Sequence, residues 1–565
     1  MAGMDLADHI AQAQHMDGPR FSLPWRSFEE FFTARVNDPA LAERPFLVYL
    51  DDERRVRRTY SYSQFGWTVS QLALVLRQQG LRRGGRLATM CFNHDQAVLL
   101  YFAAWTIGVA VVPINVEESE QKKRYILEHS EATVICCWAD CLEEVRAIQK
   151  QVPGLRRVIP IGDDGLLASV PLDPSSMGDA SEPEEVSLSD EALIVYTSGT
   201  TGEPKGVVLT AENLLIDADG IADWHGFTSD DRLMCVLPIH HVNGAVVTLV
   251  TPFYFGGGVV LTRKFKAGTF WRHIHAEGVT CVSVVPTVLE FLLMMKEDAR
   301  HDDLSRFRGV ICGAGPLLKD TAFRFTERFG VPIHHGYGLS ETTCYSCFLP
   351  RDLSADERRR WLIEYEFPSI GSPIRHNEMA ILDERGRPLP EHRRGEICIR
   401  GRTVCRGYFK RPDANEAAFR GGWFRSGDEG FYVRDKEGRP FFFISGRIKE
   451  LIIRGGINIS PLEIDEVLRG HPEITFAMAV PFEHRLYGEE IAAYLVPKNA
   501  TAPPKEADLL AYCRGRLPFA KRPKVFLFGE DIPYTSTGKP KRIELAKRLA
   551  PELAAYREVR FVDRG

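Results

Sequence analysis

The stretch YTSGTTGEPKG, residues 196–206, decides how this chain folds and what it binds. It follows an apolar segment, residues 192–196, that predicts a buried strand. Its glycines let the backbone approach an anion closely, and its hydroxyls, amides and Lys205 can bind phosphate oxygens. The spacing differs from GxxxxGKS and GxxxxGKT, so a P-loop NTPase is excluded. We expect a phosphate-binding loop formed by Thr197, Ser198, Gly199, Thr200, Thr201, Gly202 and Lys205.

On either side of this loop, short apolar strands alternate with helical segments. A helix is expected at residues 63–79 and strands at 86–91 and 133–137, and the same rhythm returns in residues 206–340. Such alternation is typical of an α/β fold with largely parallel sheets. Between residues 369 and 445 the helical patterns disappear, and short strands with Gly and Asp turns predict a β-rich lobe.

The last part of the chain mixes helices and strands. Helices are expected at 461–469, 506–515 and 542–549, and strands at 474–480, 491–496 and 524–527. About 115 residues suffice for a separate small domain. The fold class expected is α/β, with a large multi-lobed N-terminal domain and a small α+β C-terminal lid. The N-terminal domain would span residues 1–445, with two parallel-rich sheets and the β-rich lobe. A hinge would occupy 446–449 and the lid 450–565.

Composition excludes several classes of protein. The chain has 565 residues, a net charge of −5, 44% hydrophobic and 26% charged residues, which excludes disorder, collagen-like repeats and a small disulfide scaffold. The 20 basic and 16 acidic residues from 446 onward give the hinge and lid together a net charge of +4. A basic lid on an acidic body suits a small anionic ligand, and neither part is basic enough to indicate nucleic acid.

We expect neither a signal peptide nor a membrane span from the sequence. The apolar run at residues 97–114 is interrupted by Gly108 and Pro113, so we expect a buried helix, a glycine break and a buried strand rather than a membrane span. Residues 1–18 have neither the basic flank nor the apolar core of a signal peptide. Among the 12 cysteines, Cys344 and Cys347 form a CxxC without a second pair for zinc, and their role stays open. We expect reduced thiols and a cytoplasmic location.

Four further motifs follow the phosphate loop: GYGLSET at 336–342, SGD at 426–428, GRIKELIIRGG at 446–456 and TSTGK at 535–539. Together the five resemble, in order, the signatures of the adenylate-forming superfamily. That superfamily includes acyl-CoA synthetases, the adenylation domains of non-ribosomal peptide synthetases and firefly-type luciferases. The motifs cover most of the chain, and the boundary near residue 446 coincides with the family's hinge.

The resemblance implies a set of nucleotide contacts. Tyr337 offers a flat face for adenine, and Glu341 supplies a hard oxygen ligand for Mg²⁺. Asp428 and Arg447 would contact the ribose. Ser340 replaces the family's usual Thr and keeps the hydroxyl. The cofactor-binding residues expected outside the phosphate loop are Gly315, His335, Gly336, Tyr337, Gly338, Ser340, Asp428, Arg447 and Gly456. His335 stands where many members have Gln or Asn near adenine, and its protonation state is open.

The resemblance also assigns catalysis to the lid. Lys539 would bridge the substrate carboxylate and the α-phosphate and offset charge in the transition state. Lys449 would be the pivot about which the lid rotates, and Gly456 would line the passage for the pantetheine arm of coenzyme A. The role of Asn458 stays open, because relatives often have Gln or Arg there. Basic residues that could meet the phosphates of coenzyme A are Arg514, Arg516, Lys521, Arg522 and Lys524.

The acid itself is only partly constrained. The segment LPIHHVNG, 237–244, resembles the family's pocket-forming motif, with His241 at its gate as a contact on the carboxylate side. Amino-acid-activating members need an Asp directly after that position, and Val242 would leave a buried α-ammonium unpaired, which argues against an α-amino acid. GAGP, 313–316, resembles the strand that flanks the acyl group and adenine, and its small residues leave room for bulk. Short or medium fatty acids, aryl acids and polar dicarboxylates stay open.

These features predict an ATP-dependent carboxylic acid:CoA ligase of fatty acid or organic acid metabolism. It would form an acyl-adenylate, release pyrophosphate, transfer the acyl group to CoA and release AMP, using ATP, Mg²⁺ and coenzyme A. Two alternatives share the first step: a free-standing ligase that loads a carrier protein, and a luciferase-like oxygenase. A catalytically dead nucleotide-binding scaffold would lack pyrophosphate exchange, but every motif residue is present. The resemblance leaves a homodimer open.

Overall fold

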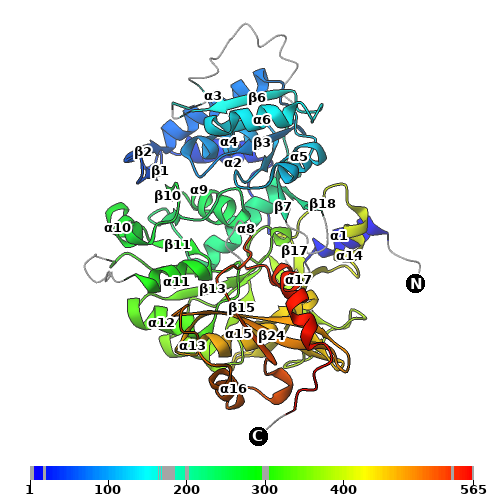
Figure 1. The fold of residues 1–565 in the computed structure, drawn as a ribbon. Coiled ribbons are helices and arrows are strands. Elements are labelled where there is room, and N and C mark those ends of the chain that lie inside the picture. The colour runs from blue at the N-terminus through cyan, green and yellow to red at the C-terminus, as the bar shows by residue number, and fades with distance from the viewer. Residues whose placement is uncertain are drawn as a thin grey trace.

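Three β-sheets with helices packed on them build the molecule (Figure 1). The computed structural model describes residues 5–16, 21–162, 164–165, 167, 185–197, 203–295, 304–535 and 540–562. Two sheets form a large body, and the third belongs to a smaller C-terminal part, residues 450–562, called the lid below. Among the described residues, no helix is long and apolar enough to cross a membrane.

Seven strands form the first sheet, in the order β18-β8-β7-β4-β3-β5-β6. Its central strands are parallel, whereas β7 pairs antiparallel with β8 and β8 with β18. The phosphate loop therefore connects two neighbouring antiparallel strands. The strands are β3 (Arg86–Met90), β4 (Ala110–Pro113), β5 (Val134–Trp138), β6 (Arg157–Ile161), β7 (Glu191–Thr197), β8 (Lys205–Thr210) and β18 (Gly407–Tyr408).

Thirteen strands form the second sheet, in the order β16-β17-β19-β20-β15-β14-β13-β12-β11-β9-β10-β1-β2. Strands β1, β10, β9, β11, β12 and β13 run parallel, and the strands of the β-rich lobe continue the same path antiparallel. The parallel part comprises β1 (Pro45–Asp51), β9 (Arg232–Cys235), β10 (Gly258–Thr262), β11 (Cys281–Val284), β12 (Gly309–Cys312) and β13 (Ile333–Tyr337), with β2 (Val56–Ser61) antiparallel at its edge. The lobe comprises β14 (Cys347–Phe348), β15 (Ser369–Pro373), β16 (Asn377–Leu382), β17 (Gly395–Gly401), β19 (Phe424–Arg434) and β20 (Pro440–Arg447).

Helices of ordinary length connect and cover these sheets. Several begin with a Ser or Thr that accepts a hydrogen bond from a first-turn amide, as Ser61 does before α3 and Thr210 before α8. Several helices end at a glycine in the left-handed region, as α8 does at Gly226. The helices of the body are α1 (Leu6–Ala13), α2 (Phe28–Val36), α3 (Tyr62–Gln78), α4 (Asp95–Thr106), α5 (Glu120–His129), α6 (Leu142–Gln149), α8 (Ala211–His225), α9 (Thr251–Phe255), α10 (Ala267–Glu277), α11 (Pro286–Met294), α12 (Lys319–Phe329), α13 (Ala355–Arg359) and α14 (Pro412–Ala418).

The lid has its own sheet and its own apolar core. Its helices are α15 (Pro461–Arg469), α16 (Glu506–Arg514) and α17 (Arg542–Leu553), and its strands are β21 (Ile452–Arg454), β22 (Ile457–Ile459), β23 (Ile474–His484), β24 (Gly488–Pro497) and β25 (Val525–Phe528). Within this core Arg542 donates to Asp465 at 2.6 Å, and both side chains are buried. The lid is therefore α+β, as expected.

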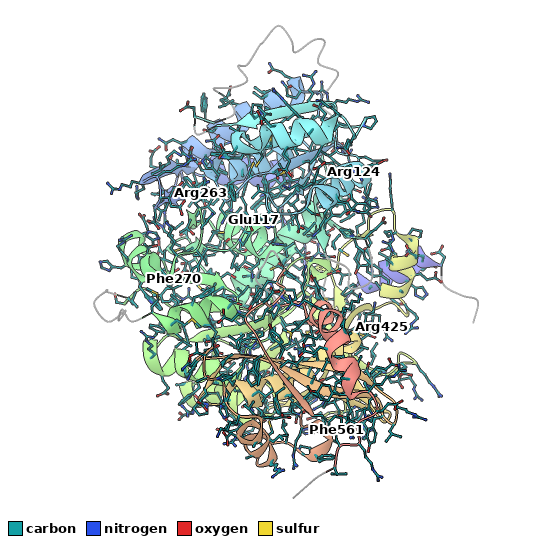
Figure 2. All side chains as sticks on the ribbon, viewed as in Figure 1. Glu117, Arg124, Arg263, Phe270, Arg425 and Phe561 are labelled. Carbon is teal, nitrogen blue, oxygen red and sulfur yellow. The ribbon has the colours of Figure 1, made fainter. Side chains whose placement is uncertain are left out.

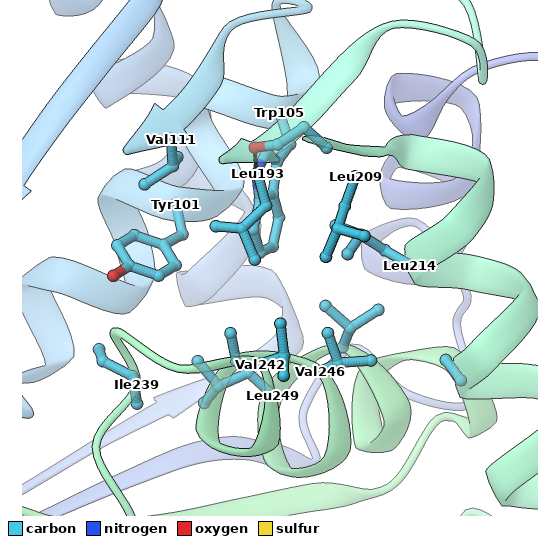
Figure 3. Packing of buried hydrophobic residues seen from close by; sticks show 14 of the residues in the cluster. Tyr101, Trp105, Val111, Leu193, Leu209, Leu214, Ile239, Val242, Val246 and Leu249 are labelled. Atoms are coloured by element: carbon cyan, nitrogen blue, oxygen red, sulfur yellow. Dashed lines mark hydrogen bonds between the residues drawn. The ribbon is translucent and has the colours of Figure 1, made fainter. Parts of the chain in front are cut away.

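The core of the body joins the two large sheets (Figure 3). Tyr101 and Trp105 from α4 and Leu193 from β7 face Val242, Val246 and Leu249 around the π-helix η3 (Asn243–Val250). The indole of Trp105 donates to the Ala192 carbonyl at 2.6 Å, which fixes α4 against β7. The apolar run at 97–114 forms the buried helix and strand that the sequence predicted, and Gly108, with φ +67°, allows the turn between them.

An ion pair and a set of buried thiols also belong to the body. In the β-rich lobe Arg425 is buried, and its Nε lies 3.0 Å from Glu396 Oε2 (Figure 2). The cysteines of the described residues are all reduced, and eleven of the twelve are buried. Both thiols of the CxxC are buried, and burial raises the pKa of Cys347. Cys344 and Cys347 belong to the apolar core of the body. Among the described residues no group of three His, Cys, Asp or Glu side chains is arranged to hold a metal.

Candidate active site

The carboxyl ends of the parallel strands meet at one edge of the larger sheet. β9, β11, β12 and β13 are consecutive neighbours, and β9, β12 and β13 are each followed by a segment that the sequence singled out. The gate segment 237–244 follows β9, residues 313–316 follow β12, and Gly338 follows β13. Ligands of open α/β sheets bind at this edge. The fold therefore brings together motifs that lie about a hundred residues apart in the chain.

Two residues of the phosphate loop are described, and both lie at strand ends. Thr197 ends β7 and Lys205 begins β8, and the two are paired in register. Ser198, Gly199, Thr200, Thr201 and Gly202 lie outside the described residues. Lys205 Nζ lies 4.9 Å from the centroid of the Tyr408 ring. Burial and the positive charges of Arg411 and Lys449 lower the pKa of Lys205, so this lysine faces a site prepared for anions.

Glu341 contacts the hydroxyl of the same tyrosine. It belongs to the short helix η5 (Ser340–Thr342), and its Oε1 accepts a hydrogen bond from Tyr408 Oη at 2.8 Å. Its backbone carbonyl accepts from the amide of Cys405 at 2.8 Å, so both ends of the residue are fixed. A single carboxylate fits Mg²⁺, which keeps several waters and binds substrate phosphates in place of a full set of protein ligands.

A network of buried Tyr337, buried Asp428 and exposed Arg447 links the residues expected around the nucleoside. Tyr337 Oη donates to Asp428 Oδ2 at 2.6 Å, and Arg447 Nε lies 2.8 Å from Asp428 Oδ1. The Asp428 carboxylate raises the pKa of Arg447, and burial together with that carboxylate raises the pKa of Tyr337. The hydroxyl of Ser426 accepts from the Asp428 amide at 3.0 Å and donates to the Ile397 carbonyl. These bonds hold the carboxylate in one position, where it can accept from hydroxyl groups.

The structure resolves the protonation state of His335. Its Nδ1 lies 2.8 Å from the Ser369 carbonyl, which requires a proton on Nδ1. Burial lowers the pKa of His335 to about 4, so the ring is neutral near pH 7. Nε2 is then an acceptor, which is the partner that the exocyclic amine of adenine needs.

The glycines of the GYG motif have packing roles. A Cβ on Gly338 would lie 1.8 Å from the Cys344 carbonyl oxygen, and one on Gly336 would lie 2.3 Å from the Phe348 ring. Both positions therefore require glycine for β13 to pack against β14 and the turn before it. Ser340 begins η5, and its carbonyl accepts from the Thr343 amide. The structure thus places Gly336, Gly338 and Ser340 in the scaffold of the site.

The backbone of the gate segment is hydrogen-bonded to the side chain of Asn93. Its Nδ2 donates to the carbonyls of Leu237 at 2.9 Å and Thr262 at 3.2 Å, and its Oδ1 accepts from the Ile239 amide at 2.9 Å. His241 follows this fixed segment, with its ring 4.5 Å from that of His240. Burial lowers the pKa of His240 to about 4.

Gly315 lies in the segment that follows β12, next to Pro286. A Cβ at this position would make an ordinary contact, 3.4 Å from Pro286.

The residues expected to act in the hinge and the lid lie in different elements. Lys449 is exposed in the short helix η7 (Ile448–Glu450), and its charge reaches Lys205. Gly456, with φ +80°, lies in the turn between β21 and β22, where a Cβ would meet nothing within 4 Å. Asn458 is exposed in β22. Lys539 lies outside the described residues.

The basic residues expected to meet coenzyme A have structural partners: Arg516 donates to the Tyr512 carbonyl at 3.0 Å, and Arg522 donates to the Leu517 carbonyl at 2.8 Å. Lys521 pairs with Glu463 at 2.6 Å. Lys524 is buried, donates to the Phe519 carbonyl at 2.8 Å and lies 3.8 Å from Glu490. The expectation was therefore wrong for Lys524, because its ammonium group is enclosed by the lid and does not face solvent.

Sequence reasoning missed Tyr408, Asn93 and Ser426. Tyr408 contacts both Glu341 and Lys205, but it lies in a two-residue strand that only the pairing with β8 positions. Asn93 makes three bonds to distant backbone groups. No local pattern marks such residues, since their roles arise from contacts across the fold. Ser426 belongs to the SGD motif and could have been included with Asp428.

Comparison with known proteins identifies the family. Residues 34–409 match the family AMP-binding enzyme, and residues 463–539 match the AMP-binding enzyme C-terminal domain. The sulfoacetate–CoA ligase of Cupriavidus necator is 35% identical over 469 residues, which cover 82% of this chain and 88% of that ligase.

Solved structures share the fold. ATP-bound MatB from Rhodopseudomonas palustris aligns with a TM-score of 0.80 at 26% identity, over 92% of this chain and 99% of MatB. The o-succinylbenzoate CoA synthetase of Bacillus subtilis, in complex with its acyl-adenylate, aligns with a TM-score of 0.76 at 28% identity, over 91% of this chain and 97% of the synthetase. This chain belongs to the AMP-binding enzyme family within the adenylate-forming superfamily, and it is an enzyme of the acid–thiol ligase class.

Proposed function

We propose that this protein is an ATP-dependent carboxylic acid:CoA ligase that works through an acyl-adenylate and releases AMP and pyrophosphate. ATP, Mg²⁺ and coenzyme A are the reactants and cofactor of its family of ligases. The observation that carries the proposal is the contact between two arrangements that come from the two large sheets. In one, Lys205 lies over the ring of Tyr408, whose hydroxyl donates to Glu341; in the other, Tyr337, Asp428 and Arg447 form one network.

The nucleotide end of the site has a role for each group. Neutral His335 accepts from the adenine amine, and the Tyr337 ring packs against the base. Asp428, fixed by Tyr337 and Arg447, accepts from the ribose hydroxyls. Lys205 and the loop before it bind the phosphates. Glu341 would hold Mg²⁺, which when bound offsets the charge of the phosphate oxygens.

The second half of the reaction involves the lid. In the proposal the body ends at residue 445, residues 446–449 are the hinge, and the lid begins at 450. Strand β20 continues through Gly446 to Arg447, so the hinge would start at the end of a strand that is paired with β19. Lys539 assists adenylation. After the lid rotates about Lys449, Gly456 lines the passage through which the CoA thiol reaches the acyl group.

The acid is proposed from the gate segment and from the relatives. Val242 is buried and apolar, so it provides no partner for an α-ammonium group. The relatives act on sulfoacetate and on o-succinylbenzoate, both of which carry an additional polar or anionic group beyond the reacting carboxylate. A carboxylic acid without an α-amino group is therefore the proposed substrate, with His241 as its contact on the carboxylate side.

A panel of acids tests this function. Purified protein with ATP, Mg²⁺ and CoA should produce AMP and an acyl-CoA in equal amounts with at least one acid of the panel, measured by chromatography and mass spectrometry. Alanine, glycine and phenylalanine should give neither product. AMP binding without AMP formation from any acid would contradict the proposal and favour a nucleotide-binding scaffold.

The two related activities give different products. A ligase that loads a carrier protein would form the adenylate but no acyl-CoA. A luciferase-like oxygenase would consume O₂ in the presence of the adenylate. Acyl-CoA formation without a carrier protein and without O₂ uptake would exclude both.

A further inference from the structure

The space left open by Gly313 is filled by a tyrosine. A Cβ on Gly313 would lie 2.6 Å from Tyr345 Oη and 2.7 Å from Tyr345 Cε1. Tyr345 is 2% exposed, and its ring centroid lies 4.4 Å from that of Phe348. The small residues at 313–316 therefore accommodate a side chain of the protein itself, and the room for a bulky acid that the sequence indicated is reduced.

A buried polar triad holds this tyrosine in place. Ser283 Oγ donates to Asn243 Oδ1 at 2.6 Å, and Asn243 Nδ2 donates to Tyr345 Oη at 3.3 Å. The Tyr345 hydroxyl also hydrogen-bonds Ser283. The three residues come from β11, the start of η3 and the segment after η5, so the ring is bonded from two neighbouring elements. A satisfied buried network of this kind favours one side-chain position.

The backbone beside Tyr345 is equally constrained. Thr343 has φ +63°, which is rare for a β-branched residue, and its hydroxyl donates to the Thr403 carbonyl at 2.6 Å. The Ser346 amide donates to the Tyr337 carbonyl at 2.8 Å. Tyr345 is thus fixed on both sides in the chain, and a longer ligand could not displace it without breaking these bonds.

The Asn243 side chain has one N–H group that the triad does not use. Asn243 carries two amide N–H groups, and within the part of the chain that the structure describes only the bond to Tyr345 uses them. Asn243 belongs to the gate segment, two residues after His241. An acceptor at the far end of a short acid would satisfy this second N–H, whereas an alkyl chain would leave it unpaired.

We infer that Tyr345 is the residue that limits acyl length, and that the ligase takes short carboxylic acids with a hydrogen-bond acceptor at the far end. This inference rests on the proposed function, since that proposal places the acid at the gate segment with His241, and the family resemblance places residues 313–316 beside the acyl group. Long-chain fatty acids are excluded because their chain would overlap the Tyr345 ring. Asn243 and Ser283 act as positioning residues for that ring.

Binding of stable acyl-adenylate mimics tests the inference without turnover. The probes are acyl-sulfamoyl-adenosines carrying butyryl, 3-carboxypropionyl or octanoyl groups, with AMP as the reference ligand, measured by calorimetry. Wild-type protein should bind the carboxypropionyl mimic most tightly and the octanoyl mimic at least about tenfold more weakly than the butyryl mimic. Tyr345→Ala and the milder Tyr345→Val should strengthen octanoyl binding by about tenfold or more, while AMP affinity stays unchanged.

Tyr345→Phe is the matched control, because it keeps the ring and removes only the hydroxyl. It should retain weak octanoyl binding. Equal binding of the octanoyl and butyryl mimics by wild-type protein, or no gain in either smaller variant, would overturn the role of Tyr345. A butyryl mimic that binds more tightly than the carboxypropionyl mimic would overturn the acceptor requirement. Failure to bind AMP or any of these mimics would instead count against the proposed function.

Discussion

At the scale of single residues, the charge of Lys205 is sensitive to its surroundings. Burial, Arg411 and Lys449 lower its pKa from that of a solvated lysine, about 10.4. A lysine with a lowered pKa loses its charge at lower pH, so kcat/KM for ATP should decline on the alkaline side before a solvated lysine would titrate. Lys205→Arg should shift this decline to higher pH, because arginine stays protonated. The measurement is the pH profile of kcat/KM for ATP between pH 7 and 10.

Lys205→Met removes the positive charge and keeps an unbranched side chain, so it tests the charge of Lys205 alone. Loss of a charge-assisted hydrogen bond is worth about 1.5–3 kcal/mol, so kcat/KM should fall roughly tenfold to a hundredfold at pH 8. An alkaline decline at the same pH in wild-type protein and in Lys205→Arg would show that another group titrates.

Replacing Asn93 should raise KM for the acid and leave KM for ATP nearly unchanged. Its side chain bonds three backbone groups that fix the gate segment ahead of His241. Asn93→Ala removes these bonds, so KM for the acid should rise about tenfold, while KM for ATP should change less than twofold. Steady-state kinetics with each substrate varied in turn give both values.

Asn213 offers a matched control for that variant. Its Nδ2 also donates to two carbonyls, those of Arg402 and Val404, and its Oδ1 accepts from the Thr210 amide at 2.9 Å. Asn213→Ala should lower stability without changing KM for the acid. If both variants change the acid KM equally, Asn93 has only a general structural role.

At the scale of elements, helix α8 carries two buried carboxyl groups with opposite environments. Asp217 is fully buried, and this burial outweighs a hydrogen bond from the Tyr345 backbone and raises the pKa of Asp217 well above its usual value. Asp219, two residues later, is bound by Arg375, by His376 at 2.5 Å and by Tyr254 at 2.7 Å, and these partners lower its pKa.

These environments predict opposite effects of pH on stability. A raised folded pKa means that Asp217 destabilises the protein as pH rises above the unfolded value, near 3.9. Asp217→Asn should therefore be about neutral at pH 4.5 and stabilising by about 1–3 kcal/mol at pH 8. Asp219→Asn should destabilise at pH 8, and its effect should shrink as pH falls. Chemical denaturation of both variants at the two pH values checks the signs, and a destabilised Asp217→Asn at pH 8 would refute this account.

Local patterns predicted elements well where neighbouring residues determine them. The expected helix at 461–469 is α15, because Pro461 starts it and apolar residues recur at helical spacing. Strand β24 is longer than expected, since pairing with β23 extends it to Gly488, Glu489 and Glu490 at its start and to Pro497 at its end. Strand β18 was not predicted, because two residues carry no periodicity and only the contact with β8 defines them.

At the scale of the whole molecule, the motifs gave the family and most of the candidate nucleotide residues, but not how the acyl side is closed. Gly313 indicates space in the sequence, and the structure fills that space with Tyr345 from a segment more than thirty residues away. The same holds for Lys524, which looks like a surface charge in the sequence and is enclosed by the lid. Such outcomes depend on contacts between distant segments.

The lid contacts the body through specific bonds. Glu466 of α15 accepts from the Lys319 amide at the start of α12 at 3.0 Å, and Ser460 donates to the Ser445 carbonyl. The hairpin of β21 and β22 is exposed in this arrangement, with Ile453 52% and Ile457 62% exposed on either side of Gly455 and Gly456. Rotation of the lid is therefore proposed to cover an apolar hairpin that this arrangement leaves in solvent.

The two half-reactions should depend differently on the lid. Lys539 is proposed to act in adenylation and to be withdrawn before thioester formation. Lys539→Ala should therefore reduce ATP–pyrophosphate exchange by about a thousandfold, while thioester formation from preformed acyl-adenylate stays within a fewfold of wild type. Lys541→Ala, at a neighbouring surface lysine that pairs with Glu544, is the matched control and should change neither rate.

The measurement that tests the central claim most directly is acid-dependent ATP–pyrophosphate exchange in the absence of CoA, made in parallel with thioester formation from added acyl-adenylate. The account predicts that wild-type protein catalyses the exchange without CoA, and that Lys539→Ala loses the exchange while keeping the thioester reaction. Exchange that requires CoA, or equal loss of both reactions in Lys539→Ala, would contradict it.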